Sequence, residues 1–301
     1  MERSAMITIC GRPNVGKSTL TNALVGEKIA IVSDKPQTTR NRIMGVHTDG
    51  ATQLVFLDTP GAHRPHDRLG DFMMESISDV VSGVDVMVLV TEPTAHISET
   101  ERSLLKQADK NKMPVILVIN KIDTVEEKAN LLVCIDTWQK EHHFEEILPI
   151  SALTGDGVDL VVSSLKAYAL EGPHFFPDDA FTDQTERTLA AELIREKMLR
   201  LLEHEIPHGI AVVIEQMTER QTAKGDVVDI SAYIYCERES HKGIIIGKKG
   251  AMLKRIGSEA RAEMEQMLGC KVNLQCWVKV KEGWRNRPGS LGEFGFTMSK
   301  D

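Results

Sequence analysis

Residues 11–18 read GRPNVGKS, which places glycines, a lysine and a hydroxyl side chain in the order GxxxxGK[ST]. In that order the backbone N–H groups of the loop and of the following helix N-terminus face bound phosphates. Lys17 would bring a positive charge to the β and γ phosphates of a nucleotide, and the Ser18 hydroxyl would be a ligand of Mg²⁺. The motif taken alone also fits an ordinary glycine turn. The residues that we expect to contact the nucleotide here are Gly11, Arg12, Pro13, Asn14, Val15, Gly16, Lys17, Ser18 and Thr19.

A second motif, DTPG, follows a predicted strand over residues 51–57. Its aspartate, Asp58, would hold Mg²⁺ through a water molecule, and the backbone N–H of Gly61 would sense the γ-phosphate. A proline-glycine turn is the alternative explanation. The residues expected to contribute to the nucleotide site are Asp58, Thr59, Pro60 and Gly61.

Residues 37–40, QTTR, lie between these two motifs in a loop that could close over the nucleotide. One threonine hydroxyl of this loop would join the Mg²⁺ ligands only when the γ-phosphate is present. The sequence leaves open whether that ligand is Thr38 or Thr39. Both threonines, together with Lys17 and Gly61, are candidate catalytic residues.

A third group of residues accounts for the choice of base. Asn120-Lys121-Ile122-Asp123 closes a predicted strand over 115–120. Guanine presents N1–H and N2–H₂ donors side by side, which one carboxylate can accept together, whereas ATP would leave that carboxylate without these donors. Asn120 would fix the loop, and the aliphatic stem of Lys121 would cover the ring. After the next strand, the sequence Ser151-Ala152-Leu153 would place the N–H of Ala152 near the guanine carbonyl oxygen.

Short apolar runs alternate with helical patterns over the first 170 residues, which predicts an α/β domain with a mostly parallel sheet. With the phosphate-loop motif at residues 11–18, the predicted fold class is an α/β P-loop NTPase domain. Asp49-Gly50 is a hairpin signal, so one strand should be antiparallel. The predicted strands are 6–10, 42–48, 51–57, 84–91, 115–120 and 147–150. The predicted helices are 17–25, 67–82, 98–111, 125–142 and 157–169, and Ser98 with Glu101 forms a capping box.

The pattern changes after residue 170. Residues 171–181 contain two prolines and predict a linker between domains. The order αββααβ then predicts a small α+β domain, with a helix before residues 247–250 and other elements at 186–202, 210–217, 227–236, 251–268 and 271–281. We therefore divide the chain into a nucleotide domain, a linker, an α+β domain and a tail, over 1–170, 171–181, 182–285 and 286–301. We expect the tail to be loosely ordered unless it docks on another surface.

The charge of the chain is unevenly distributed. Its net charge is −8, yet residues 241–287 contain 11 Lys or Arg against four Glu. This stretch includes Gly247-Lys248-Lys249-Gly250, which has the form of the GxxG loop that clamps a nucleic-acid backbone in KH domains. A plain helix connector is the alternative. The residues expected to contact RNA are Ile244, Ile246, Gly247, Lys248, Lys249, Gly250, Lys254 and Arg255, with Arg261 as an added phosphate contact. We place Trp277 in the core and name Trp284 as a candidate for base stacking.

Composition excludes several classes of protein. The 301 residues are 42% hydrophobic, enough for a large core, and no apolar run approaches the roughly 20 residues needed to cross a bilayer. The start of the chain leads directly into a predicted strand, which leaves no room for a signal peptide. The five cysteines form no CxxC pair and are expected to be reduced core thiols of a cytosolic protein.

The motifs GRPNVGKS, QTTR, DTPG, NKID and SAL resemble the five signature elements of translation-factor-related P-loop GTPases. In Ras-like enzymes a glutamine after the DxxG glycine orients the attacking water, but here that position is Ala62. The chain is therefore similar to GTPases with a hydrophobic residue at that site, which implies slow basal turnover. Members with an asparagine at the position of Asn14 often use K⁺, so the resemblance implies a catalytic role for Asn14 as a K⁺ ligand.

A GTPase of this type followed by a type II KH domain resembles the Era family, bacterial GTPases of small ribosomal subunit assembly. The resemblance covers roughly residues 1–290 and implies GTP/GDP and Mg²⁺ as ligands and the 3′ end of 16S ribosomal RNA as a partner. It also implies a cytoplasmic monomer that assists 30S subunit assembly and associates peripherally with the inner membrane. The alternatives are a nucleotide-gated RNA-binding protein with incidental hydrolysis, a related GTPase acting in tRNA modification or at the membrane, and an ATPase.

Overall fold

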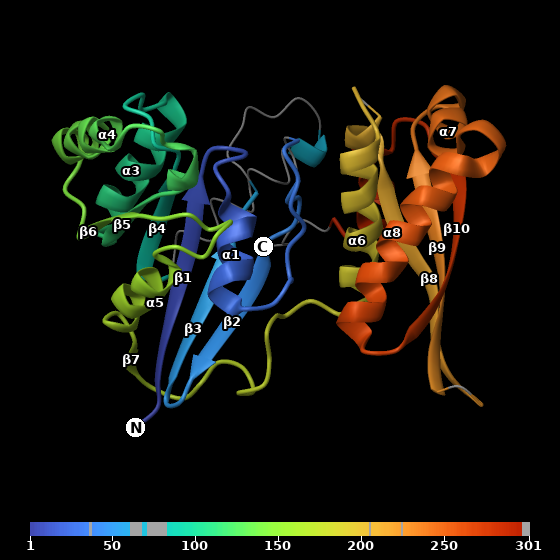
Figure 1. Ribbon diagram of the computed structural model, residues 1–301, viewed down its shortest axis with the longest axis horizontal. Coiled ribbons are helices and arrows are strands. Elements are labelled where there is room, and N and C mark those ends of the chain that lie inside the picture. The colour runs from blue at the N-terminus through green and yellow to red at the C-terminus, as the bar shows by residue number, and fades with distance from the viewer. Residues whose placement is uncertain (36–37, 61–67, 71–82, 205, 224, 297–301) are drawn as a thin grey trace. The chain divides into compact units, whose positions relative to one another are not determined.

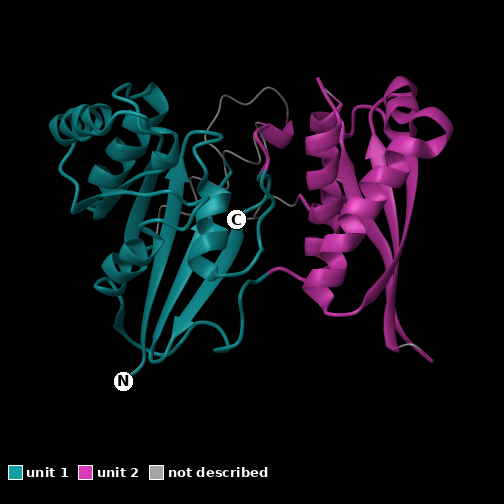
Figure 2. Ribbon diagram, viewed as in Figure 1, with its two compact units in different colours: residues 1–32, 39–64, 73–183 teal, residues 33–38, 65–72, 184–301 magenta. Residues whose placement is uncertain are grey.

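The computed structural model describes residues 1–35, 38–60, 68–70, 83–204, 206–223 and 225–296. The chain forms two compact units (Figure 2). The first contains Met1–Val32, Thr39–Arg64 and Met73–Asp183, and the second contains Ser33–Thr38, Pro65–Phe72 and Gln184–Asp301. Gly61, Ala62 and most of the predicted helix over 67–82 lie outside the described residues.

The first unit is built on a mixed sheet with the strand order β2-β3-β1-β4-β5-β6 (Figure 1). The parallel strands are nearly continuous apolar runs because both faces of the sheet are covered. β1, β3, β4, β5 and β6 are parallel, and β2 is antiparallel to β3, as predicted. The strands are β1 (Arg3–Gly11), β2 (Ile43–Asp49), β3 (Thr52–Asp58), β4 (Val86–Thr91), β5 (Val115–Ile119) and β6 (Glu146–Pro149).

The described helices of the first unit follow the predicted positions closely. They are α1 (Lys17–Val25), α3 (Glu99–Asn111), α4 (Lys128–Glu141) and α5 (Val158–Lys166), with a 3₁₀ turn over Ile122–Thr124. The predicted capping box at α3 is present, since the Ser98 side chain accepts from the Glu101 backbone N–H and the Glu101 side chain accepts from that of Ser98. None of the described helices is both long and apolar enough to span a bilayer.

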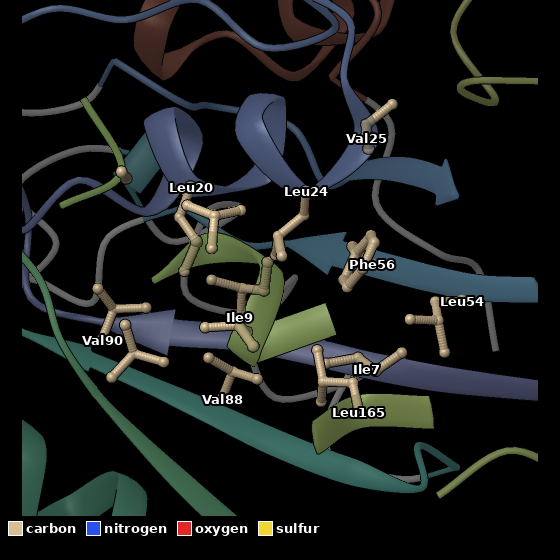
Figure 3. Close-up of a cluster of buried hydrophobic side chains, with 14 of the residues drawn as sticks. Ile7, Ile9, Leu20, Leu24, Val25, Leu54, Phe56, Val88, Val90 and Leu165 are labelled. Carbon is tan, nitrogen blue, oxygen red and sulfur yellow. The ribbon is translucent and has the colours of Figure 1, made fainter. Parts of the chain in front are cut away.

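Two apolar clusters cover the two faces of this sheet. In one cluster, Leu20 and Leu24 of α1 and Leu165 of α5 pack against Ile9 and Phe56 of the strands (Figure 3). In the other, side chains of α3 and α4 pack on the opposite face. The sheet therefore holds α1 in a fixed position, and with it the last two residues of GRPNVGKS, which begin this helix.

The segment predicted as a linker is attached to the first unit. Its first residue, Glu171, belongs with Leu170 to a second antiparallel strand, β7 (Leu170–Glu171), beside β1. Farther along, the Phe176 carbonyl accepts from Gln53 Nε2 at 2.9 Å, and the Phe181 carbonyl accepts from the Val46 N–H at 2.9 Å. The segment thus pairs with the otherwise unpaired edge of β2, which caps an exposed sheet edge.

The second unit has the predicted αββααβ order. Its sheet has the order β10-β9-β8, with β9 antiparallel to β8 and parallel to β10. Helices α6 and α8 pack on one face of this sheet around a buried apolar cluster (Figure 1). The elements are α6 (Glu186–Leu201), β8 (Ala211–Thr222), β9 (Gly225–Cys236), α7 (Glu239–Ile246), α8 (Ala251–Leu268) and β10 (Lys271–Val280), with 3₁₀ turns over Pro207–Gly209, Lys248–Gly250 and Trp284–Asn286.

The described part of the tail is folded onto this unit. A short helix, α9 (Pro288–Glu293), follows β10, and Leu291 and Phe296 are buried. The ring of Phe294 lies 4.8 Å from that of Tyr235 and 5.2 Å from that of Trp284. The tail up to residue 296 therefore takes the docked alternative, because its apolar side chains gain more from burial than the backbone loses in freedom.

Candidate nucleotide site and nucleic-acid interface

The GRPNVGKS loop joins the end of β1 to the start of α1. Gly16 precedes α1 with a φ of 97°, and Gly11 has a φ of 150°. A Cβ at Gly11 would lie 2.3 Å from the Val90 carbonyl oxygen, and one at Gly16 would lie 2.2 Å from Asn120 Nδ2. Both glycines are therefore required by close approach as well as by backbone conformation. Asn14, the K⁺ candidate, has a left-handed φ of 66° at the top of the loop.

Lys17 is buried at the centre of this loop. Its Nζ donates to the carbonyls of Arg12, at 2.8 Å, and Gly11, at 3.2 Å. Burial lowers the pKa of Lys17, and the nearby carboxylate of Asp58 opposes that shift. A buried ammonium held by two carbonyls is suited to exchange those partners for phosphate oxygens, which bind a cation more strongly.

Three oxygen-bearing side chains meet beside Lys17. Ser18 Oγ donates to Asp58 Oδ2 at 2.8 Å and lies 2.8 Å from Thr39 Oγ1. Among the described residues, Asp58 Oδ1 is buried without a hydrogen-bond partner. Oxygen ligands, one of them an orphaned carboxylate oxygen, suit a hard cation such as Mg²⁺. The Thr38 hydroxyl instead donates to the Lys35 carbonyl at 2.6 Å, so the geometry favours Thr39 over Thr38 as the metal ligand.

The acidity of Asp58 should make metal binding depend on pH. Burial raises the pKa of Asp58 from 3.8 to about 6, although the charge of Lys17 and the Ser18 hydrogen bond act against this shift. Protons therefore compete with Mg²⁺ for this carboxylate. We expect the Mg²⁺-dependent part of nucleotide affinity to be lost as the pH falls through about 6, and we expect more Mg²⁺ to move that midpoint lower. Calorimetric titrations across this range, with and without a metal chelator, check the prediction.

The free energy of unfolding depends on pH in the opposite direction from metal binding. In the metal-free protein the folded state binds the Asp58 proton more tightly than the unfolded state does, because the folded pKa is the higher one. The contribution of this group to stability is therefore full at acid pH and declines as the pH rises toward about 6.

The nucleotide-binding titrations also test the assignment of Asp58. A pH midpoint for nucleotide binding that does not move with the Mg²⁺ concentration would contradict the assignment of Asp58 as a metal-site residue.

Asn120 connects the phosphate loop with the predicted base loops. Its Nδ2 donates to the Val15 carbonyl at 2.9 Å, and its Oδ1 accepts from the Ala152 N–H at 2.9 Å. Lys121 Nζ donates to the Asn14 carbonyl at 2.7 Å. Asp123 Oδ1 accepts from Ser151 Oγ at 2.6 Å, which orients this carboxylate. The structure therefore brings together the three loops that the sequence assigns to one guanine site, while Leu153 is exposed beside them.

Gly16→Ala tests this link. The new Cβ would displace Asn120, and alanine would have to adopt an unfavourable positive φ. We therefore expect a lower free energy of unfolding and at least about a tenfold loss of GTP affinity. Gly26→Ala is the matched control, because Gly26 ends the same helix with a φ of 85° and open space around its Cα. The control should lose about 1 kcal/mol of stability and keep its GTP affinity. Equal GTP affinity of both variants would contradict the proposed link through Asn120.

Two acidic residues near the site were not identified as site residues from the sequence. Glu101, fully buried, accepts from Arg12 Nε at 2.9 Å and from Thr91 Oγ1 at 3.1 Å while it completes the α3 capping box. Glu92 forms an ion pair with Lys121. Both tie the motif side chains to neighbouring elements. The capping box signals Glu101 in the sequence, but only the fold shows that Arg12 reaches it.

The GKKG loop lies between α7 and α8 in the second unit. Gly247 and Gly250 have φ values of 71° and 79°, and a Cβ at Gly247 would lie 2.7 Å from Met252 Cβ. Lys248 and Lys249 are exposed at the tip, and Lys249 also has a positive φ of 52°. The loop therefore presents two cations on a backbone that a phosphate can approach closely.

A hollow of about 350 Å³ lies beside this loop, between α8 and β10. Its walls include the predicted contact Lys254 and also Arg261. Ile244 and Ile246 belong to α7, and Ile244 is half exposed. Neither of them is among the residues that line the hollow. Several lining residues were missed because they read as ordinary helix and strand positions; they are Leu253, Gly257, Ser258, Leu274 and Cys276. Burial raises the pKa of Cys276 to about 11, so its thiol is a neutral part of the wall.

The two tryptophans of the second unit exchange their predicted places. Trp284 is 0% exposed, and its Nε1 donates to the Gly209 carbonyl at 3.0 Å. Trp277 is 43% exposed on β10. The prediction of Trp277 in the core was wrong because strict alternation along β10 turns its odd-numbered residues away from the helices. Trp284 is buried in the core, so its ring has no exposed face on which a base could stack.

Comparison with known proteins agrees with this geometry. Residues 6–121 match the family model described as 50S ribosome-binding GTPase, and residues 205–285 match that of the KH domain. GTPase Era of Clostridioides difficile is 51% identical over 296 residues, which are 98% of this chain and 99% of that protein. GTPase Era of Alkaliphilus metalliredigens is 47% identical, with 98% and 99% covered.

Solved structures extend the similarity to three dimensions. The chain matches a crystal structure of Era in complex with MgGDPNP and nucleotides 1506–1542 of 16S ribosomal RNA, with a TM-score of 0.93, 40% identity, and 99% of this chain and 100% of that chain covered. A variant of Aquifex aeolicus Era bound to GDP and AlF₄⁻ matches with a TM-score of 0.92 and 40% identity, covering 98% of this chain and 100% of that chain. With full-length relatives at about half identity and both domains matched, the chain belongs to the Era family of GTPases.

Proposed function

We propose that this GTPase is a switch that binds the 3′ end of 16S ribosomal RNA, assists assembly of the 30S subunit, and uses its nucleotide state to control RNA binding and release. The observation that carries the proposal is the full-length match to Era in complex with MgGDPNP and nucleotides 1506–1542 of 16S ribosomal RNA. The exposed GKKG loop and the hollow beside it support the proposal, because they offer a cationic surface that RNA can approach.

We assign the Mg²⁺ of the GTP complex to Ser18, Thr39 and Asp58, with Asp58 acting through a water molecule. The metal would neutralise charge that develops on the β and γ phosphates. Lys17 holds the same phosphates, and Thr39 enters the site as part of a loop that closes over GTP. When the γ-phosphate is lost, Thr39 loses the interaction that holds its loop closed over the nucleotide. The closed and open loops are the two states that a switch needs.

In Ras-like GTPases a glutamine after the DxxG glycine orients the attacking water, and this chain has Ala62 at that position. We propose that the backbone around Gly61 positions the water and that K⁺, held by Asn14, adds positive charge at the phosphates. Turnover measured in K⁺ and in Na⁺ buffers tests this point. Equal rates would remove the K⁺ role and leave the Mg²⁺ assignment intact.

RNA contacts are assigned to the GKKG loop and the adjoining helices. Lys248 and Lys249 would contact phosphates, with Lys254 and Arg255 beside them on α8. Both α8 side chains are exposed, although Arg255 Nε also donates to Glu259 at 2.9 Å. Ile244 and Ile246 would form an apolar border on α7, and Gly247 and Gly250 allow the RNA backbone to approach.

Replacing both Lys248 and Lys249 by Glu tests the RNA assignment. Four units of charge change at the loop tip, so we expect at least about a tenfold loss of affinity for an RNA of the 16S 3′ end, with a weaker salt dependence. GTP turnover without RNA should not change, because these residues are remote in sequence from the nucleotide motifs. The control reverses Lys106 and Lys110, which are exposed on α3 of the first unit.

The same assay separates the competing functions. Unchanged RNA affinity would make GKKG a connector and favour a GTPase that acts in tRNA modification or at a membrane. Turnover that stays flat when 16S RNA or 30S subunits are added would favour an RNA-binding protein with incidental hydrolysis.

The monomeric state and peripheral association with the cytoplasmic face of the inner membrane stay predictions. Sedimentation of the GTP-bound protein tests the first. Flotation with vesicles of bacterial lipid composition tests the second, and protein that remains entirely in the lower fraction would contradict it.

A further inference from the structure

The face of the three-stranded sheet that turns away from α6 and α8 has a distinct composition. On β9 the even-numbered residues from Val228 to Cys236 belong to the buried cluster, so the odd-numbered residues face the other way. Parallel pairing places Trp277 beside Tyr233 and Lys279 beside Tyr235. The GKKG hollow uses Leu274 and Cys276, which lie on the helix side of β10. The open face is therefore separate from the GKKG groove.

Aromatic rings form the centre of this open face. The Trp277 and Tyr233 ring centroids are 5.7 Å apart with planes inclined by 45°, and those of Tyr233 and Tyr235 are 6.3 Å apart. Phe294 of the tail packs on Tyr235 and covers that end. Trp277 is 43% exposed, which leaves much of a large flat ring in contact with water. Such a ring is the usual platform on which an unpaired base stacks.

Positive charge surrounds these rings. Lys279 Nζ lies 3.3 Å from the centroid of the Tyr233 ring, and Lys281 Nζ lies 5.9 Å from that of Tyr235. Within the part of the chain that the structure describes, Lys279 pairs with no carboxylate, whereas Lys281 pairs with Glu293. Lys271 and Arg220 extend the same face, where Lys271 pairs with Glu265 and Arg220 pairs with Asp229. Lys279 therefore keeps its positive charge available beside the rings, where it can pair with a phosphate.

We propose that this open face is a second RNA site, at which a single-stranded segment stacks a base on Trp277 and places a phosphate at Lys279. The proposal rests on the proposed RNA-binding function and adds a surface on the opposite side of the KH sheet. A protein partner fits less well, because the centres of protein interfaces are depleted of lysine and this face has lysine among its rings. Polar side chains at Asn273, Gln275 and Ser231 surround the stack and can bond to base edges.

The fluorescence of Trp277 gives a direct test in the full-length protein. The other tryptophans, Trp138 and Trp284, are both 0% exposed, so iodide should quench Trp277 selectively. Titration with the 16S 3′-end RNA and with oligoadenylate should quench this emission and protect it from iodide. Trp277→Ala should lower the affinity for oligoadenylate about tenfold, and Trp277→Phe, which keeps a ring, should lower it less.

The variants of the GKKG loop separate the two sites. The Lys248→Glu and Lys249→Glu double variant should still show quenching of Trp277 by oligoadenylate. Tight, GKKG-dependent RNA binding with Trp277 emission and Trp277→Ala affinity unchanged would overturn this inference and leave the proposed function in place. Protection of Trp277 by ribosomal proteins but not by RNA would also overturn it, in favour of a protein interface. Absence of RNA binding by the unmodified protein would overturn both proposals.

Discussion

Replacing Lys17 by alanine is expected to lower kcat/KM for GTP roughly a thousandfold, the upper range for loss of one preorganised donor at a developing charge. The expectation follows from the position of the side chain. Lys17 is buried, and its ammonium is held by the Gly11 and Arg12 carbonyls beside the carboxylate of Asp58. Alanine removes the central cation of the phosphate loop and leaves the Asp58 carboxylate buried without it.

Two control variants make the result interpretable. Lys110→Ala removes an exposed lysine of α3 and should leave both turnover and stability unchanged. Lys17→Arg keeps the charge but brings a wider planar group into a loop built around a point charge. It should recover part of the binding and little of the rate. Circular dichroism and denaturant unfolding establish that each variant is folded, and wild-type turnover of folded Lys17→Ala would refute the role of Lys17.

The elements that the sequence predicts well are those whose signals are local. β5 and α1 were predicted almost residue for residue, because a short apolar run and a glycine-bounded helical pattern leave little freedom. The capping box at Ser98 is equally local. The clustering of four of the motifs follows from the same logic, since GRPNVGKS, DTPG, NKID and SAL stand at the ends of parallel strands, which bring those ends to one edge of the sheet.

Features that depend on contacts between distant residues were not predictable. Whether Thr38 or Thr39 reaches Ser18 depends on the path of a loop, and the sequence motif fits either of the two adjacent threonines equally well. The exchange of Trp277 and Trp284 depends on strand register and on a tail that folds back. The attachment of residues 171–181 depends on side-chain and backbone partners such as Gln53, far away in sequence. In each case the deciding partner is more than a local window away.

Asp123→Asn is expected to lower GTP affinity by about a thousandfold and to create affinity for xanthosine triphosphate. One oxygen of Asp123 accepts from Ser151 Oγ at 2.6 Å, which fixes the orientation of the carboxylate. Guanine needs an acceptor for its N1–H and N2–H₂ donors, and an amide offers one acceptor and a mismatched NH₂ group. Xanthine has a carbonyl oxygen in place of the amino group, so the same NH₂ group becomes a match. Losses of this size are typical where a site built to hydrogen-bond an N–H group of its ligand loses the matching acceptor.

Competition binding with GTP, ATP and xanthosine triphosphate measures the switch. Asp159→Asn, an exposed carboxylate on α5, should leave the preference for GTP unchanged. Ser151→Ala should weaken GTP binding moderately without changing the preferred base, because it removes the partner that orients Asp123 and leaves the acceptor in place. An Asp123→Asn protein that still prefers GTP would mean that the base is read elsewhere, and an unmodified protein that binds ATP equally well would exclude guanine selection at this loop. A switch to xanthine in Asp123→Asn alone, with Ser151→Ala only weakened, would therefore establish both the reading residue and the residue that holds it in position.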